Sequence, residues 1–263
     1  MSSYKTIKLE RDGAVATLTL DRPDSANALD LEMATELMRA AIELDEDADV
    51  RAVILTANGK MFCAGGDLGA MKQAGDGASA YIKEMAGNLH LAISRFARMR
   101  APVLAAVNGT AAGAGFSMIC ATDLAIASET AKFTMAYTGA GLSPDGSSTY
   151  FLPRIIGQRR TFELMLTNRV LNSAEALEWG LVNQVVPAED LMPTVEKLAR
   201  QLASGPTGAF GIVKRLLLNS AYDSLESQME HEARGIADSA RTEDGREGIA
   251  AFLEKRRPEF TGN

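Results

Sequence analysis

The residues best suited to chemistry lie in a stretch of small side chains, residues 108–117. Glycine or alanine fills nearly every position from 109 to 115, and side chains this small let a ligand approach the backbone. The apolar runs on either side predict a buried strand before the stretch and a buried helix after it. Because the first amides of a helix lack internal partners and lie at the positive end of its dipole, this stretch is suited to hold a negatively charged oxygen. A close strand-to-helix turn without chemistry explains the stretch, taken alone, equally well.

A second glycine-rich loop, residues 57–68, follows a β-branched apolar run at residues 50–56. Its Gly65-Gly66 pair permits backbone angles that other residues rarely adopt. Residues 72–80 beyond this loop are polar and rich in glycine, and we expect them to be mobile.

The order of the expected elements favours an α/β domain followed by helices. Strands are expected at residues 6–10, 14–20, 50–56, 102–107, 123–128, 132–135 and 181–186, and Asp12-Gly13 predicts a hairpin between the first two. Helices are expected at residues 30–45, 80–99, 116–121, 188–203, 207–220, 224–240 and 243–255, and Asp30 is expected to cap the first of them. Because strands come early and helices late, we predict a core over residues 1–200 and a helical region for oligomerisation over residues 201–263.

Composition excludes several classes of partner and cofactor. The 263 residues carry a net charge of −7 and a pI near 5.0, which makes nucleic acid an unexpected partner. No run is long enough to span a membrane, and the N-terminus lacks the apolar core of a signal peptide. Cys63 and Cys120 lie in apolar or small-residue surroundings and suggest reduced thiols in a cytoplasmic protein. With His90 and His231 as its only histidines, the chain is not expected to bind a metal.

Short motifs occur in a characteristic order along the chain, at residues 62–68, 108–115, 141–146, 152–154, 179–181 and 246–255. Through these motifs the chain resembles the enoyl-CoA hydratase/isomerase (crotonase) superfamily over nearly its full length. The resemblance implies an α/β fold with a ββα spiral core and a C-terminal helical trimerisation region. It also implies a homotrimer or a dimer of trimers that acts on a coenzyme A thioester, with no cofactor beyond the coenzyme A of the substrate.

The resemblance assigns a role to both glycine-rich loops. In this family, two backbone amides bind the thioester oxygen when it becomes an enolate, and the matching positions are Gly66 and Ala114. Donors of this kind act on charge that develops during the reaction, and each contributes about 3 kcal/mol. The further positions that match substrate-binding residues of the family are Arg22, Ala26, Ala28, Ala64, Gly65, Asp67, Leu68, Gly113, Tyr137, Phe252 and Lys255.

Three of these positions carry further expectations. Family members often place residues that match Phe252 and Lys255 against the nucleotide end of coenzyme A, commonly across a subunit boundary. Asp67 is also expected to cap a short helix after the oxyanion loop. Residues 72–81 are expected to shape the acyl pocket.

The side chains depart from the pattern of the hydratases. Those enzymes use two glutamates to activate water, and the matching positions here are Ser117 and Tyr137. Neither side chain supplies a carboxylate, so hydration of a 2-enoyl thioester is not expected. The chain instead has Asp145 in a glycine-rich loop, where a base near the thioester could remove a proton. Taken alone, Asp145 is better explained as a turn or helix-capping residue, but the family context favours the base.

His90 has more than one interpretation. A lone histidine on a helix is usually a core or surface residue. The aryl-CoA dehalogenases of the superfamily, however, pair a histidine at this position with an aspartate that matches Asp145. The chain lacks their tryptophan near that aspartate and has Tyr137 instead. His90 could alternatively orient Asp145 or line the acyl pocket.

The residues thus predict an acyl-CoA isomerase. Asp145 would move a proton along an unsaturated or epoxidised acyl group while Gly66 and Ala114 stabilise the enolate. A dehalogenase-like or hydratase-like enzyme remains an alternative, as does a non-catalytic acyl-CoA binder or an RNA-binding relative. The acidic composition disfavours RNA, and Asp145 disfavours an inactive protein.

Overall fold

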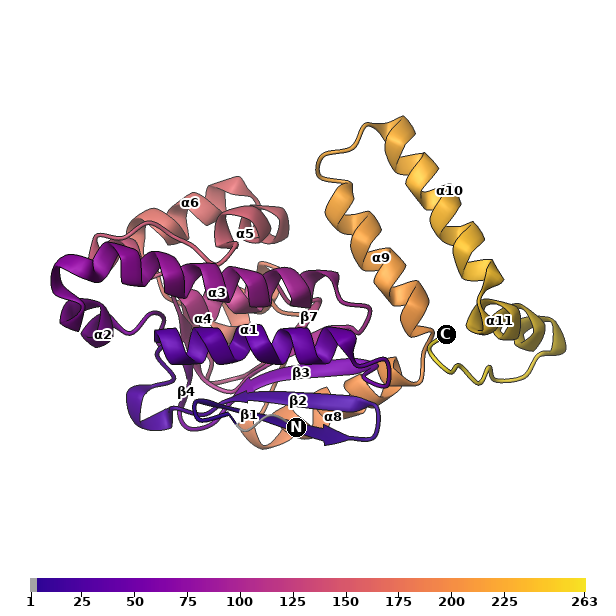
Figure 1. Ribbon diagram of the computed structural model, residues 1–263, viewed down its shortest axis with the longest axis horizontal. Coiled ribbons are helices and arrows are strands. Elements are labelled where there is room, and N and C mark those ends of the chain that lie inside the picture. The colour runs from indigo at the N-terminus through magenta and orange to yellow at the C-terminus, as the bar shows by residue number, and fades with distance from the viewer. Residues whose placement is uncertain (1–3) are drawn as a thin grey trace.

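The computed structural model describes residues 4–263 and contains two sheets flanked by helices (Figure 1). The larger sheet has the strand order β1-β2-β3-β5-β7-β10, in which only the β1–β2 pair is antiparallel. Its strands are β1 (Ile7–Asp12), β2 (Val15–Leu20), β3 (Ala52–Ala57), β5 (Val103–Val107), β7 (Leu124–Ser128) and β10 (Gln184–Val186). The predicted hairpin, strands and chain order are confirmed here within one or two residues, except that β10 is shorter than expected.

A smaller sheet, which the sequence did not predict as a separate layer, has the order β4-β6-β8-β9. Its strands are β4 (Met61–Cys63), β6 (Thr110–Ala112), β8 (Lys132–Thr134) and β9 (Leu171–Asn172). Strands of two or three residues are too short to show an alternating apolar pattern. Along the chain, β3, β5 and β7 of the larger sheet are each followed by one strand of the smaller sheet and then by a helix, which is the expected ββα spiral.

Helices cover both faces of the larger sheet. α1 (Leu31–Glu46) and α3 (Ala78–Arg98) lie side by side on one face, and α8 (Leu191–Ala203) packs against the other (Figure 1). The Asp30 side chain caps α1 by accepting a hydrogen bond from the Met33 amide, as predicted. α8 extends past residue 200, where we expected the core to end.

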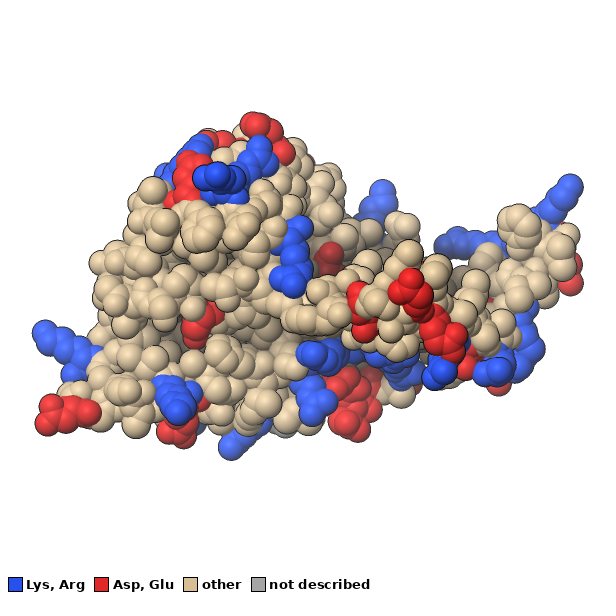
Figure 2. All heavy atoms as spheres, turned by 90° about the horizontal axis from the view of Figure 1, so that it is seen from above, with Lys and Arg blue, Asp and Glu red and all other residues tan. Residues whose placement is uncertain are grey.

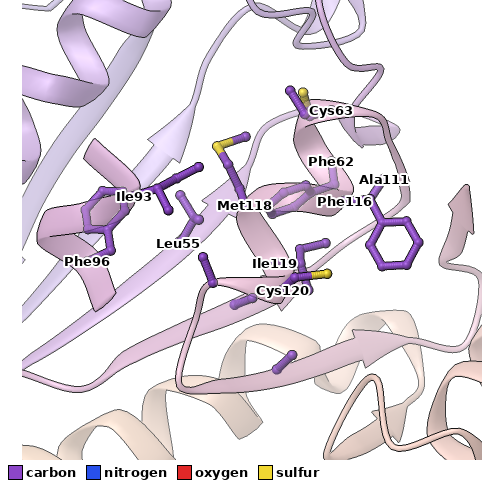
Figure 3. Packing of buried hydrophobic residues seen from close by; sticks show 14 of the residues in the cluster. Leu55, Phe62, Cys63, Ile93, Phe96, Ala111, Phe116, Met118, Ile119 and Cys120 are labelled. Carbon is purple, nitrogen blue, oxygen red and sulfur yellow. The ribbon is translucent and has the colours of Figure 1, made fainter. Parts of the chain in front are cut away.

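The core lies mainly between the sheets and helices α1, α3 and α4 (Ala114–Cys120). All residues of α4 are buried, and Figure 3 shows Phe116, Met118 and Ile119 of this helix packed near Phe62. The helix is enclosed by the core, since none of its residues is exposed. Its first residue, Ala114, therefore has a fixed position.

Three further helices come after β8 in the chain: α5 (Ser148–Ile156), α6 (Gln158–Thr167) and α7 (Ser173–Glu178).

The segment that we expected to be mobile instead has regular structure. Residues 72–80 comprise the end of α2 (Leu68–Gln73), a 3-10 turn at Gly75–Gly77 and the first turn of α3. Among residues 4–263, no helix combines the length and the hydrophobicity needed to cross a membrane.

The C-terminal helices form an arm that projects from the core (Figure 1). The arm contains α9 (Thr207–Asn219), α10 (Leu225–Arg241) and α11 (Glu243–Glu254), as the sequence predicted. Lys214 of α9 is buried and joins the arm to the core through an ion pair with Asp123 at 2.7 Å. On the face shown in Figure 2, basic and acidic side chains are interspersed and do not form one basic patch.

Candidate active site

The two glycine-rich loops meet at the carboxyl ends of β4 and β6. Gly65 and Gly113 have φ angles of +99° and +49°, in the region that favours glycine. A Cβ atom added to Gly113 would lie 3.3 Å from the Cα atom of Gly65, so the two backbones pass in close contact. Small residues are therefore required at this crossing for a steric reason, whatever the chemistry nearby.

Two backbone amides at this crossing are free to bind a ligand. Among residues 4–263, neither the Gly66 amide nor the Ala114 amide donates a hydrogen bond. Both residues line one cavity of about 230 Å³. Ala114 is the first residue of α4, where backbone amides carry the partial positive charge of the helix dipole. Two unpaired amides that face one cavity are suited to bind a developing oxyanion, which is the role that the resemblance implies for them.

The cavity lining combines apolar and polar side chains. Its apolar residues include Leu68 and Met71 of α2 and Ile82, Met85 and Ala86 of α3. Three of its side chains carry oxygen atoms, which are Tyr137, Ser143 and Asp145. The expected acyl-pocket segment, residues 72–81, is absent from the lining, and the residues on either side of it take that place.

Asp145 lies in this cavity with a hydrogen-bond donor on one of its oxygens. The Tyr137 hydroxyl donates to Oδ1 of Asp145 at 2.7 Å. Burial, followed by the charge of Asp145, raises the pKa of Tyr137 above its ordinary value. Tyr137 therefore keeps its proton at neutral pH and remains a donor to the carboxylate.

Ser117 extends this contact into the core. Its hydroxyl lies 2.9 Å from the Tyr137 hydroxyl, and the Ser117 side chain is completely buried. At the two positions where family hydratases carry glutamates, this chain therefore has two linked hydroxyls that lead to a single carboxylate, Asp145.

His90 lies beside Asp145 but is not part of the cavity lining. Its Nε2 atom accepts a hydrogen bond from the Gly146 amide at 3.2 Å and lies 3.6 Å from Oδ2 of Asp145. The position of His90 next to Asp145 agrees with an orienting role, and the structure gives no support to the interpretation in which His90 lines the acyl pocket.

The loop of residues 22–30 is joined to the oxyanion loop by a short ladder of backbone hydrogen bonds. The Leu29 amide donates to the Gly65 carbonyl, and the Asp67 amide donates to the Leu29 carbonyl, both at 2.7 Å. The Ala64 amide donates to the Ala26 carbonyl at 3.0 Å. This ladder fixes the backbone on both sides of Gly66.

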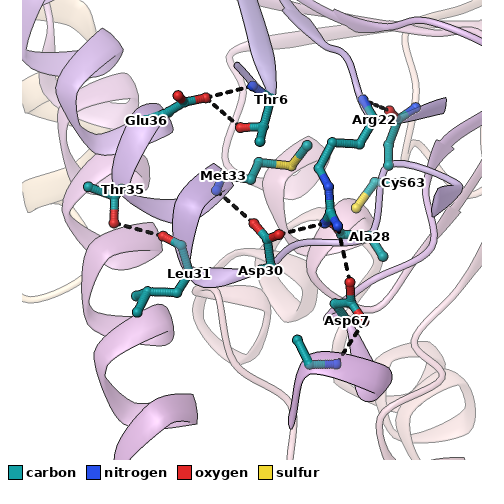
Figure 4. Close-up of polar contacts among 12 residues, drawn as sticks. Thr6, Arg22, Ala28, Asp30, Leu31, Met33, Thr35, Glu36, Cys63 and Asp67 are labelled. Atoms are coloured by element: carbon teal, nitrogen blue, oxygen red, sulfur yellow. Dashed lines mark hydrogen bonds and ion pairs between the residues drawn. The ribbon is translucent and has the colours of Figure 1, made fainter. Parts of the chain in front are cut away.

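Arg22 fastens the same two loops through its side chain (Figure 4). Its guanidinium lies 3.1 Å from Asp30 and 3.3 Å from Asp67, and it also donates to the Ala28 carbonyl. Asp67 caps α2 through the Ala70 amide, as predicted. The carboxylates of Asp30 and Asp67 together neutralise the Arg22 charge. The structure therefore favours a role for Arg22 in holding the two loops together over a role as a free cation that binds a phosphate group.

Two predicted residues lie far from this cavity in the same chain. Phe252 and Lys255 belong to the end of α11, in the projecting arm (Figure 1). The Phe252 side chain is 83% exposed. Neither residue lines the cavity. Contact with a substrate would therefore require the cavity of another copy of the chain.

Met71, Met85 and Ser143 line the cavity although sequence reasoning did not single them out. A Cβ atom added to Gly66 would lie 2.5 Å from the Cε atom of Met71, so this thioether packs directly on the oxyanion loop. Met85 lies on the buried face of α3 together with Leu89, and apolar residues at helical spacing indicate a buried face without distinguishing a cavity wall from the core.

A larger hollow of about 590 Å³ lies between α5 and α9. It is lined mostly by apolar side chains such as Phe151, Phe210 and Leu217. Its charged residues include Asp123 and Lys214, which pair with each other. The amides of Gly66 and Ala114 and the carboxylate of Asp145 all lie at the smaller cavity, which is therefore the better candidate for catalysis.

Comparison with known proteins defines the class. Residues 10–263 match the model of the enoyl-CoA hydratase/isomerase family, and the chain is an enzyme of this family. It is 38% identical over 249 residues to the 1,2-epoxyphenylacetyl-CoA isomerase of Escherichia coli (strain K12), covering 94% of this chain and 95% of that protein.

Two other relatives carry different names. The chain is 37% identical over 250 residues to 4-chlorobenzoyl coenzyme A dehalogenase-2 of an Arthrobacter species, covering 95% of this chain and 91% of that protein. The solved structure of an enoyl-CoA hydratase from Polaromonas sp. JS666 has a TM-score of 0.92 and 33% identity, covering 97% of this chain and 99% of that one. The three names describe three reactions, so similarity defines the family and the acyl-CoA chemistry but not the individual reaction.

Proposed function

We propose that this protein is an acyl-CoA isomerase that moves a proton along the acyl group through an enolate. One observation carries the proposal: a single carboxylate, Asp145, lines the same cavity as the free amides of Gly66 and Ala114. Ser117 and Tyr137 supply hydroxyls where a hydratase needs two acids, which disfavours activation of water.

The proposed reaction begins with the thioester oxygen bound to the amides of Gly66 and Ala114. Asp145 removes a proton from the carbon next to the thioester, and the electron pair of the broken C–H bond delocalises onto the oxygen. In a 3-enoyl thioester the resulting dienolate is reprotonated two carbons further along, which yields the 2-enoyl isomer. Asp145 returns the proton, so that the enzyme ends in its starting state and no external oxidant or reductant is needed.

Epoxidised and aromatic acyl groups belong to the same proposal. The cavity is lined by apolar side chains that suit a ring or chain, and three of its lining side chains carry oxygen atoms. The 38% identity with the epoxyphenylacetyl-CoA isomerase supports substrates of this kind. Asp145 would again move a proton while the two amides hold the enolate.

A panel of coenzyme A thioesters tests the proposal. The panel contains 3-enoyl, 2-enoyl, epoxyphenylacetyl and halobenzoyl thioesters, and the products are followed by ultraviolet absorbance and mass. We expect a product of unchanged mass from the 3-enoyl or the epoxyphenylacetyl thioester. Addition of water to the 2-enoyl thioester at an ordinary enzymatic rate, roughly 1–1000 per second, would overturn the proposal.

A dehalogenase-like reaction is the second candidate, because His90 lies 3.6 Å from Oδ2 of Asp145. In such a reaction the carboxylate would attack the ring carbon and expel halide, and water would then cleave the aryl ester. The Arthrobacter relative supports this alternative. Release of halide from the halobenzoyl thioester, measured with a halide-sensitive electrode, distinguishes it from isomerisation.

We further propose that the chain assembles as a homotrimer or a dimer of trimers through its arm. Helices α9–α11 and the connection between α9 and α10 expose large apolar side chains in the single chain: Val213, Leu217, Tyr222, Leu225, Met229, Ile236, Ile249, Phe252 and Leu253. Such a surface is typical of a protein interface. Light scattering at micromolar concentration tests the assembly, and a monomer would contradict it.

A further inference from the structure

We propose that Tyr137 is a positioning residue for Asp145. In this inference, which rests on the proposed isomerase function, the Tyr137 hydroxyl holds Oδ1 of Asp145 so that Oδ2 alone exchanges the proton with the acyl group. Ser117 sets the direction of the Tyr137 hydroxyl and allows the Asp145 loop to approach it.

The hydrogen-bond geometry gives each hydroxyl a direction. Tyr137 has one proton, and the carboxylate at 2.7 Å is a stronger acceptor than the neutral Ser117 oxygen at 2.9 Å. The Tyr137 oxygen is then an acceptor for Ser117. The Gly113 carbonyl, 3.2 Å from Ser117 Oγ, is the longer alternative. The order of donation is thus from Ser117 to Tyr137 to Asp145.

A steric fit between Ser117 and Gly146 makes this order possible. A Cβ atom added to Gly146 would lie 2.8 Å from the Cβ atom of Ser117 and 3.4 Å from its Oγ. Gly146 has a φ of +60°, so glycine is favoured there on conformational grounds as well. Because Ser117 is fully buried, a longer side chain at position 117 would displace the loop that carries Asp145.

The two oxygens of Asp145 therefore differ. Oδ1 accepts from a phenol that keeps its own proton, which reduces the electron density available there for another proton. Among residues 4–263, no group donates a hydrogen bond to Oδ2, and the Nε2 atom of His90 lies 3.6 Å from it. Positioning of this kind matters because a displacement of about 1 Å costs roughly 100-fold in rate.

The consequence is a testable route for the proton. With Oδ1 occupied by Tyr137, the proton that Asp145 takes from the substrate stays on Oδ2 and is returned to the same molecule. Without the Tyr137 hydroxyl, Oδ1 can accept from water, and the carboxyl group can exchange its proton with solvent. Loss of this hydroxyl should therefore increase solvent deuterium in the isomerised product.

The experiment compares Tyr137→Phe with Tyr150→Phe in deuterated water, using the thioester from the panel that the wild type isomerises best. Both substitutions remove one phenol hydroxyl and keep the ring. The Tyr150 hydroxyl donates to the Leu218 carbonyl at 3.3 Å in the larger hollow, away from Asp145. We expect Tyr137→Phe to lower kcat by about 10- to 100-fold. The dissociation constant of a non-reactive thioester should stay within about twofold, since the lining ring remains.

We also expect Tyr137→Phe, but not Tyr150→Phe, to raise the deuterium content of the product, a change that general loss of folded protein would not cause. If Tyr137→Phe has the kcat and the product deuterium content of the wild type, this inference is overturned. The isomerase proposal would still stand in that case, provided that Asp145→Asn is inactive. Absence of isomerisation by the wild type on every thioester would overturn both proposals.

Discussion

Two partly buried aspartates, Asp123 and Asp145, show how partners decide the role of one residue type. Asp123 pairs with the buried Lys214 at 2.7 Å and accepts from the Val103 amide at 2.7 Å. Asp145 has a neutral phenol on one oxygen and no cation within 3 Å of the other. The charge of Asp123 is therefore neutralised in the protein, whereas Asp145 keeps an oxygen that can accept a proton.

The surroundings of the two aspartates also differ: Asp123 belongs to a structural ion pair, and Asp145 lies in a cavity. Burial raises the pKa of Asp123 and lowers that of Lys214, while their mutual attraction opposes both shifts. The pair holds α9 of the arm against the core, because Lys214 also donates to the carbonyls of Phe96 and Ala101. Asp145 instead lies beside two free amides in a cavity. Asp123 thus serves stability, and Asp145 is available for chemistry.

The largest effect that tests this comparison is expected from Asp145→Asn. The substitution keeps size and most hydrogen-bond geometry but removes the basic carboxylate. We expect isomerisation to fall by about 100- to 10,000-fold, the usual contribution of a general base. Thioester affinity and melting temperature should change little. A stable Asp145→Asn protein with near wild-type isomerisation would show that Asp145 is not the base and has a structural role.

Ala114→Pro tests the oxyanion side of the same cavity. Ala114 is the first residue of α4, so proline removes the free amide and also strains the start of this buried helix. We expect kcat to fall by about 100- to 1000-fold, the usual effect of losing one oxyanion donor. Ala114→Gly, which keeps the amide, is the matched control. Equal turnover of the two variants would place the oxyanion site elsewhere.

Asp123→Asn sharpens the comparison because it makes the same chemical change at the other aspartate. It leaves Lys214 buried without a counter-charge, and breaking a buried pair in this way costs about 3–5 kcal/mol of unfolding free energy. Chemical denaturation measures the loss. The folded fraction should isomerise at the wild-type rate, and a rate loss as large as that of Asp145→Asn would remove the distinction between the two aspartates.

His90→Ala should have the smallest effect on isomerisation. It removes one hydrogen bond from the Gly146 amide, a contact of about 0.5–1.5 kcal/mol, so kcat should fall by about tenfold at most. The same preparation is assayed for halide release from a halobenzoyl thioester. Loss of halide release with isomerisation retained would favour the dehalogenase-like alternative, because only that reaction needs a base for water.

Local sequence determined the turns and the helix caps of this protein. The Asp12-Gly13 turn predicted the hairpin of β1 and β2, and Asp30 and Asp67 predicted the caps of α1 and α2. These features depend on residues within a few positions of one another, which is the range over which turn and capping preferences act. The family motifs added the ββα core and directed attention to both glycine-rich loops.

Tertiary structure decided the features that depend on distant contacts. The strands of the smaller sheet have two or three residues each, and only their pairing across the chain defines them. The resemblance gave Arg22 as a substrate-binding position, but only the structure shows that Asp67, 45 positions away, neutralises part of its charge. Residues 72–81 looked mobile and central to the acyl pocket, yet they form helical turns outside the cavity lining.

The chemistry at Asp145 shows the same division most clearly. The resemblance to the family identified Asp145 as a candidate base and Ser117 and Tyr137 as the positions where hydratases carry glutamates. It could not show that these hydroxyls are linked to each other and to Oδ1 of Asp145, because the three residues come from α4 and two separate loop positions. The close approach of Gly146 to the buried Ser117 brings them together, and such packing depends on three-dimensional distances that no local pattern contains.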